Sequence, residues 1–275
     1  MAQRPERNEN GRVKLSPGEE QKRYYKYYLE DMAQPDPATI GKILSGPIRP
    51  DQAIPFTERN RVFDEFEGEV GYTVMPDGTG YLSNFLRMPG VTTEMFDWWF
   101  AWHCLDDLRY TIWDPEDHWY ARTQNRVRAL DPKLSYRERL WNTSHDIIED
   151  IGMGPDHIFI NFKNPGDMGF DVSRIGTEAC STLVCGNGYG VGQPPYATVG
   201  TFMSHTVRER GDGLELRSIF WFGWKHENGR DIKVLPDGMR VPPMGPMALL
   251  LHNVKEFTNL ARLIPRVYAE EKDNF

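Results

Sequence analysis

The sequence has few of the features that mark secreted or membrane-bound proteins. Its three cysteines, Cys104, Cys180 and Cys185, include no Cys-x-x-Cys pair, which excludes a disulfide framework and a thiolate zinc site of usual spacing. The apolar runs fall well short of the roughly 20 residues that a membrane span needs. Residues 1–20 are polar and lack the hydrophobic segment of a secretory signal. We therefore expect a cytoplasmic protein with no membrane partner.

An excess of basic charge is also missing. The chain has 32 Lys and Arg against 40 Asp and Glu, a formal net charge of −8. A general nucleic-acid binder needs a basic surface to meet phosphates, so we expect no nucleic-acid partner. With 275 residues, of which 39% are hydrophobic, the chain can bury an ordinary core as one large domain or as a domain with an extension.

Aromatic residues, in contrast, are abundant. The 8 Trp, 12 Tyr and 14 Phe make up 12% of the chain, and many of them gather in short segments. Aromatic clusters usually form the core, but they also line pockets for flat ligands. The composition therefore indicates a soluble enzyme, or a binder, of an apolar small molecule.

The N-terminal part differs from the rest in pattern. Residues 1–18 read as a disordered or loosely attached arm, and residues 19–32 have the composition of a helix with a tyrosine-rich face. Five prolines then punctuate a long connector, at positions 35, 37, 47, 50 and 55. We place a boundary near Val62, so residues 1–62 are expected to be a helical extension that supports oligomerisation and residues 63–275 the main domain.

The main domain carries strand signals followed by one long helix. Pro76-Asp77-Gly78 and Arg210-Gly211-Asp212-Gly213 have hairpin-turn chemistry between strand-like segments. The predicted strands are 69–75, 80–87, 156–162, 178–185, 198–209 and 214–224, with a helix over 92–104 and the Gly-rich segment 186–192 as a loop. Residues 246–272 form an amphipathic pattern that predicts a long C-terminal helix. The fold class is therefore α+β, a curved antiparallel sheet that grips the helix and leaves a cavity beside it.

Candidate chemistry begins on that C-terminal helix. His252 and Glu256 are four residues apart, so both side chains leave the same helix face and could share a zinc ion. This spacing alone is weak, because His103, His145 and His205 also have an acidic residue four positions later. Their expected burial among apolar residues favours His252 and Glu256 as the pair that binds a metal. An ordinary ion pair at the edge of a helix remains the alternative interpretation.

Other histidines lie in recognisable settings. His118 follows a run of aromatic and acidic residues, His205 lies inside a predicted strand, and alternation places His145 and Glu149 on one strand face. Each of these histidines alone is more typical of an ordinary core or surface position. The sequence has no nucleophile elbow, phosphate loop or dinucleotide fingerprint in the right context.

Taken together and in order, these motifs resemble a known family. They are Trp98-Trp99 to Trp102-His103, Arg109-Tyr110, Trp113-Asp114-Pro115-x-x-His118, Glu149-Asp150-Ile151-Gly152, Ser204-His205-Thr206-Val207-Arg208 and His252-Asn253-Val254-Lys255-Glu256-Phe257. The chain resembles the phloretin hydrolase and 2,4-diacetylphloroglucinol hydrolase family from about residue 66 to residue 265, and its phloretin branch more closely. The resemblance implies a Bet v 1-like helix-grip catalytic domain and an N-terminal part involved in dimerisation.

The same resemblance implies a site. One zinc ion is expected on His118, Glu149, His252 and Glu256. Tyr110, His205 and Trp224 fall where the family places substrate-contacting or proton-handling side chains, so we assign Tyr110 and Trp224 to substrate binding and His205, with Glu149, to catalysis. Four ligands would close a tetrahedral site, so either the zinc becomes five-coordinate or one Glu is a nearby base. The sequence leaves this choice open.

The implied reaction is hydrolysis of the carbon–carbon bond between an acyl carbonyl and a polyhydroxylated ring, as in phloretin to phloroglucinol and phloretic acid. Zinc would activate water and a histidine would deliver a proton. Trp224 stands where the diacetylphloroglucinol branch has Tyr, which favours one long arylalkyl acyl chain. Two alternatives remain: a hydrolase that prefers 2,4-diacetylphloroglucinol, and a non-catalytic helix-grip binder of apolar aromatic ligands.

Overall fold

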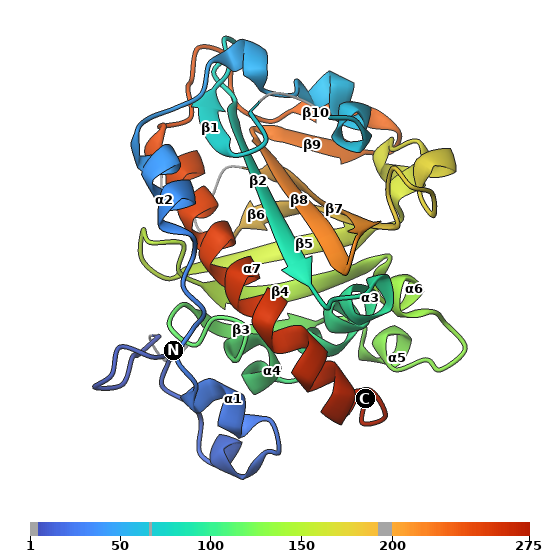
Figure 1. Cartoon of the computed structure of the whole chain (residues 1–275). Helices are drawn as coiled ribbons and strands as arrows, with labels where there is room; N and C mark the ends of the chain where they lie inside the picture. The colour runs from blue at the N-terminus through green and yellow to red at the C-terminus, as the bar shows by residue number, and fades with distance from the viewer. Residues whose placement is uncertain (1–4, 66–67, 192–199) are drawn as a thin grey trace.

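A single antiparallel sheet organises the protein. The computed structural model describes residues 5–65, 68–191 and 200–275. Within them, eight strands pair in the order β1-β2-β8-β7-β6-β5-β4-β3 (Figure 1). Their bounds are β1 Gly71–Val74, β2 Gly80–Pro89, β3 His118–Thr123, β4 Thr143–Glu149, β5 Asp156–Lys163, β6 Thr182–Gly190, β7 Thr201–Arg210 and β8 Gly213–Phe222. A separate two-stranded hairpin joins β9 Trp224–Glu227 and β10 Arg230–Lys233.

Helices are short except for the last one. The α-helices are α1 Tyr25–Leu29, α2 Pro37–Leu44, α3 Thr93–Trp102, α4 Asp107–Thr111, α5 Arg126–Ala129, α6 Tyr136–Leu140 and α7 Met244–Glu271. The 3-10 helices are η1 Glu19–Gln21, η2 Pro50–Gln52, η3 Phe56–Phe63, η4 His103–Leu105, η5 Pro165–Met168 and η6 Val172–Arg174. No helix of the described residues is both long and apolar enough to cross a membrane.

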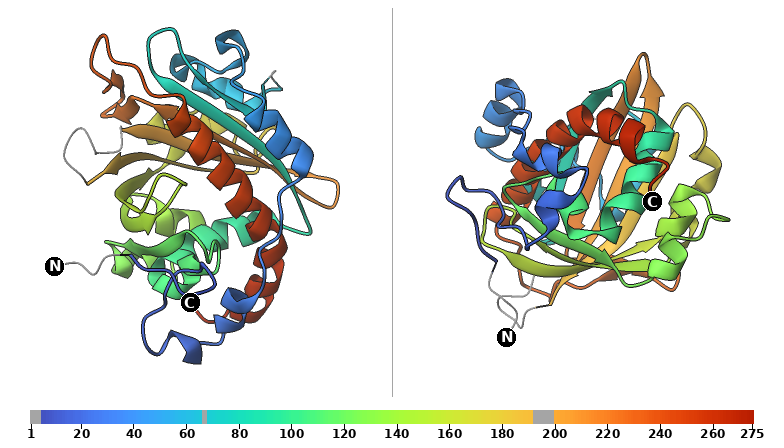
Figure 2. Two further views of the ribbon diagram at one scale, coloured as in Figure 1. Left: turned by 90° about the vertical axis from the view of Figure 1, so that its left-hand side faces the viewer. Right: turned by 90° about the horizontal axis from the view of Figure 1, so that it is seen from below.

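The C-terminal helix α7 lies in the concave side of the curved sheet (Figure 2). It has 28 residues and continues through Pro265. Its buried face includes Leu250, Phe257 and Leu260, which belong to one hydrophobic cluster with residues of the sheet and of α3. Removing this apolar stripe from water is the main force that seats the helix. The predicted α+β arrangement, a curved antiparallel sheet around a long C-terminal helix, is confirmed.

Strand alternation separates two hydrophobic cores. Met203 and Phe220 face α7 on the concave side, whereas their chain neighbours Phe202 and Ile219 face the other side. The second core packs the convex face of the sheet against η3, which lies in the predicted N-terminal extension except for its last residue, Phe63. The extension is therefore joined to the sheet by a common hydrophobic core, in addition to the covalent continuity of the chain.

One predicted loop is a strand. Residues 186–190 were expected in a Gly-rich loop, but they form the second half of β6 and pair with β5 and β7. At Gly186 a Cβ atom would lie 2.7 Å from the backbone oxygen of Asn161 on β5, so glycine allows a close approach of the two strands. Gly192, the last glycine of the predicted loop, lies outside the described residues.

The N-terminal arm is also different from the prediction. Most residues from 5 to 18 are exposed or half-buried, but the arm is anchored at Val13. Val13 is only 2% exposed, and its amide donates a hydrogen bond to the carbonyl of Pro115. The predicted helix over 19–32 is limited to the short elements η1 and α1. Tertiary contacts with the rest of the protein hold the arm. The local sequence pattern could not predict these contacts, because their partners lie far away in the chain.

Candidate metal centre

Three elements bring the four predicted ligands to one end of the sheet. His118 begins β3 and Glu149 ends β4, and the two residues are directly opposite each other in the antiparallel register. His252 and Glu256 lie one turn apart on α7. The register of two strands and the seating of one helix thus create the site.

The ligand atoms converge closely. The Nε2 atoms of His118 and His252 lie 3.1 Å apart, and Oε2 of Glu256 lies 3.6 Å from the first and 4.0 Å from the second. Ligand atoms at 2.0–2.1 Å around a tetrahedral zinc ion would be separated by about 3.3–3.4 Å. Two imidazoles and a carboxylate are also a donor set typical of zinc. The residues present therefore fit the predicted metal.

Glu149 adjoins this group through Tyr110. The hydroxyl of Tyr110, a residue of α4, donates a hydrogen bond to Oε2 of Glu149. The Tyr110 ring stacks on the His118 imidazole, with centroids 4.0 Å apart and planes 1° from parallel. One aromatic side chain thus contacts two predicted ligands from neighbouring strands and fixes their relative position.

Burial controls the protonation of these groups. Loss of solvation lowers the pKa of His118 and of His252, so both imidazoles are neutral and keep a lone pair for a metal. Burial, and then the charges of Glu149 and Asp114, raise the pKa of Glu256 well above its usual value. Burial likewise raises the pKa of Glu149. Burial thus favours the uncharged form of both carboxyl groups, and a cation bound beside them would offset this cost and stabilise their charged form.

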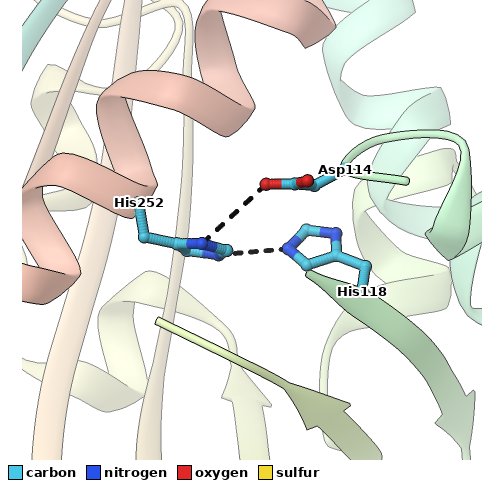
Figure 3. Close-up of side chains that lie close together, drawn as sticks. All are labelled: Asp114, His118 and His252. Atoms are coloured by element: carbon cyan, nitrogen blue, oxygen red, sulfur yellow. Dashed lines mark hydrogen bonds and ion pairs between the residues drawn. The ribbon is translucent and has the colours of Figure 1, made fainter. Parts of the chain in front are cut away.

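Asp114 belongs to the same region, although sequence reasoning missed it. Asp114, His118 and His252 form a fully buried group whose ligand atoms lie within 4.8 Å of one another (Figure 3). Oδ2 of Asp114 lies 3.9 Å from Nδ1 of His252 and 3.1 Å from Nζ of Lys255. Asp114 is next to Nδ1 of His252, while Nε2 of the same ring is next to His118. At 3.9 Å the carboxylate makes no hydrogen bond to the ring, so it acts on His252 through its charge.

A second unpredicted group orients Glu256. The Nδ2 amide of Asn253 donates to Oε1 of Glu256 at 2.9 Å, and Nδ2 of Asn84 on β2 donates to Oδ1 of Asn253 at 3.0 Å. Both asparagines are almost completely buried. This chain engages one oxygen of Glu256 and leaves Oε2 next to the histidines. The only sequence signal was the position of Asn253 between two predicted ligands.

A cavity in the interior of the grip borders Glu149. It lies between the concave face of the sheet and α7, and Glu149 and Asp156 are among its walls. The remaining lining is mostly apolar and includes Ile158, Ile160, Met203, Phe220, Phe222 and Leu249. The predicted cavity beside the helix is therefore present, and one of the four predicted ligands faces it.

The region that contains these residues matches a known family. Residues 54–269 match the family described as the DAPG hydrolase PhiG domain. The chain belongs to the DAPG hydrolase family. It is 43% identical over 270 residues to the phloretin hydrolase of Eubacterium ramulus, with 96% of each chain covered. It is 29% identical over 262 residues to the 2,4-diacetylphloroglucinol hydrolase of Pseudomonas protegens, with 90% of this chain and 84% of that one covered. The resemblance predicted from the motifs is confirmed.

Among solved structures, Ara h 8.0201 aligns with this DAPG hydrolase family member at a TM-score of 0.39 and 7% identity. The alignment covers 68% of this chain and 98% of that one. At that score the likeness has no bearing on function. The helix-grip arrangement is evident from the strand order and from the position of α7 alone.

Two predicted site residues of this DAPG hydrolase family member lie apart from the ligand cluster. His205 on β7 is buried, its Nδ1 is 2.8 Å from Oγ of Ser218, and its ring is 5.0 Å from that of Phe257. Burial lowers the pKa of His205 to about 3. Trp224 begins β9 and stacks on Phe56 in the core of the convex face. The structure thus brings together the four predicted ligands and Tyr110, but neither His205 nor Trp224.

Proposed function

We propose that this chain is a zinc-dependent hydrolase that cleaves the carbon–carbon bond between an acyl carbonyl and a polyhydroxylated ring, with phloretin as its substrate. The observation that carries the proposal is the convergence of His118, His252 and Glu256 within 3.1–4.0 Å, next to a largely apolar cavity that reaches Glu149. The names of the relatives in Eubacterium ramulus and Pseudomonas protegens support this substrate class.

In this proposal, His118, His252 and Glu256 hold the zinc ion, with Glu149 as a fourth ligand or as a base. When bound, zinc supplies a Lewis acid that activates water near neutral pH and polarises a carbonyl. The surrounding residues fix the ligands: Asp114 and Lys255 behind His252, Asn253 beside Glu256, and Tyr110 between His118 and Glu149. Such outer partners set the orientation of ligands and the strength of binding.

Glu149 is suited to proton transfer in this reaction. It lies at the wall of the cavity, and burial raises the pKa of its carboxyl toward the working range of a general base. We assign it the proton of the attacking water. The water oxygen then bonds to the carbonyl carbon, and the bond from that carbon to the ring breaks with its electron pair on the ring. The ring carbon takes up the proton, which gives a free phenol and a carboxylic acid.

The ring can leave only because hydroxyl groups ortho and para to the bond stabilise the electron pair as a phenolate or its keto tautomer. The chemistry of the cavity wall, which combines Phe220 and Phe222 with aliphatic side chains, suits a flat polyphenol. His205 lies on the same strand face as Met203, a residue of that wall, so we retain it as a proton-handling candidate. Trp224 would influence the acyl preference only indirectly, through Phe56.

The competing function is a non-catalytic binder of aromatic ligands. The apolar cavity alone is consistent with it, but a binder has no use for two neutral imidazoles and two carboxylates buried together. Metal analysis and product analysis separate the two. A zinc hydrolase should contain about one zinc per chain and convert phloretin to phloroglucinol and phloretic acid. A metal-free protein that binds phloretin without converting it would support the binder.

We further propose that residues 1–62 support a homodimer of the catalytic domain, residues 63–275. Leu29 at the end of α1 and Leu44 at the end of α2 support this, because their side chains are 57% and 62% exposed. Exposed large aliphatic side chains are often covered by a partner. Light scattering on the purified chain, and on a Leu29→Glu/Leu44→Glu variant, should give a dimer and a monomer respectively. A monomeric parent would contradict the proposal.

A further inference from the structure

Residues 5–14 of the N-terminal arm lie against the outer side of the proposed metal centre. Arg7 and Val13 pair as an antiparallel bridge, so the arm folds back on itself. The Val13 amide donates to the carbonyl of Pro115 at 2.7 Å, and Nε1 of Trp119 donates to the carbonyl of Glu6 at 3.2 Å. Figure 1 shows the arm, in dark blue, beside β3 and α4. It therefore contacts the chain on both sides of His118.

Arg7 makes the central contacts of the arm. Its Nη2 atom lies 2.9 Å from Oδ1 of Asp117 and 2.9 Å from Oδ2 of Asp150, and its Nη1 donates to the carbonyl of Glu116. The guanidinium also lies over the Trp119 ring, 4.9 Å from its centroid. Asp117 immediately precedes the proposed ligand His118, and Asp150 immediately follows the proposed ligand Glu149. One side chain thus joins the two strand ends that carry ligands.

The two negative charges at these strand ends explain the role of a positively charged side chain between them. Asp117 and Asp150 are adjacent, since the amide of Asp150 donates to the carbonyl of Asp117 at 2.9 Å. Both carboxylates are largely buried, with side chains 19% and 12% exposed, so their repulsion is only partly screened by water. Lys255 of α7 also pairs with Asp117, whereas Arg7 spans both strands. Arg7 offsets the repulsion between the two carboxylates, which opposes the close approach of the ends of β3 and β4.

We infer that Arg7 is a positioning residue of the metal centre: it holds the ends of β3 and β4 together, so that His118 and Glu149 stay aligned with the ligands on α7. The inference rests on the proposed zinc site and deepens it. Groups that orient ligands typically change metal affinity 10–100-fold, and Arg7 acts through the residues next to the ligands. We therefore expect about tenfold faster zinc release when its charge is removed.

The test is the rate of zinc release from the purified, zinc-loaded full chain into excess chelating dye. Arg7→Ala should release zinc about tenfold faster than the parent, and Arg7→Lys, which restores the charge and one ion pair, should be intermediate. The matched control is Arg12→Ala, because Arg12 lies in the same arm but binds Asp31 and the carbonyl of Tyr28. Release from Arg7→Ala at the parental rate would overturn the inference.

A second variant tests the physical cause. Asp150→Asn removes one of the two repelling charges but keeps an oxygen that can accept from the amides of Gly152 and Gly154. The double variant Arg7→Ala/Asp150→Asn should release zinc more slowly than Arg7→Ala. Equal rates would overturn the explanation by charge. A parent chain that holds no zinc would contradict the proposed metal site itself, whereas a zinc-bound parent with an unaffected Arg7→Ala contradicts the inference alone. Melting temperatures of the metal-free variants check that each one folds.

Discussion

Nε2 of His118 and Nε2 of His252 lie 3.1 Å apart, although 134 positions separate the two residues in the chain. Both imidazoles are buried and neutral, so one of them must donate to the other or both must face a common cation. The carboxylate of Glu256 approaches the same point from one turn further along α7. The proposed shared metal ion would account for all three orientations at once.

The first prediction concerns the ligands. His252→Ala and Glu256→Ala should each lose most of the bound zinc, because each removes one donor from a site with few of them. Metal analysis of the purified variants is the measurement. His157→Ala is the control, since His157 lies on β5 paired with Asp146 at a partly exposed position. Full zinc retention in both ligand variants would exclude these residues from direct contact with the metal.

The second prediction concerns Asp114. Asp114→Asn keeps the size of the side chain but removes the charge near Nδ1 of His252, and should weaken zinc binding by about tenfold. Competition with a chelator of known affinity measures the change. Glu116→Gln is the matched control, because Glu116 also pairs with Lys255 but is exposed. Equal affinities in the two variants would reduce Asp114 to a structural role.

The third prediction concerns pH-dependent stability. Burial raises the pKa of Asp97 on α3 to about 6, from 3.8 for a free side chain. The folded state therefore keeps this proton between pH 4 and 6, where the unfolded chain has lost it, so the contribution of Asp97 to stability falls as pH rises through that window. Asp97→Asn stays neutral and can still accept from Oγ1 of Thr182.

The metal-free Asp97→Asn variant should therefore be about 1–3 kcal/mol more stable than the parent at pH 8 and nearly equal to it near pH 4. Denaturant unfolding at both pH values is the measurement. Asp51→Asn, at an exposed position in η2, is the control and should change little. A stability difference that does not depend on pH would refute the assigned cause.

The fourth prediction concerns His205. If it handles a proton or a ring hydroxyl, His205→Ala should lower kcat for phloretin by roughly 10²-fold, with zinc content unchanged. Its low pKa indicates that the imidazole acts in its neutral form, as a hydrogen-bond donor or acceptor rather than as a charged acid. Steady-state kinetics together with metal analysis test this. Turnover close to the parental rate would leave His205 as a core residue.

The fifth prediction concerns the substrate. Phloretin should be cleaved, while a matched ketone that lacks the ortho and para hydroxyls should bind but not react, because its ring cannot hold the departing electron pair. We also expect a higher kcat/KM for phloretin than for 2,4-diacetylphloroglucinol, by roughly 1–3 kcal/mol in free energy of activation. A clear preference for the diacetyl compound would contradict the phloretin assignment and leave the metal site intact.

A feature was predictable from the sequence when all the residues that produce it lie within one helix or one turn. His252 and Glu256 share a helix face because the α-helical repeat places residues four apart on one side. The hairpin turns and the apolar stripe of α7 are equally local, so the α+β class followed from them. The predicted ligand role of His118 and Glu149 rested only on the family resemblance, because their pairing depends on the register of β3 and β4.

Only the tertiary structure brought the supporting residues to the site. Asn84 and Arg7 reach it from two separate segments, β2 and the N-terminal arm, through Asn253 in one case and through Asp117 and Asp150 in the other. Spacing along the chain contains no information about such contacts, because they form when a sheet curves around a helix and an arm folds back onto it. The sequence by itself determined the periodicity, the family and the donor types, whereas long-range packing decided which atoms meet and which, like Trp224, lie elsewhere.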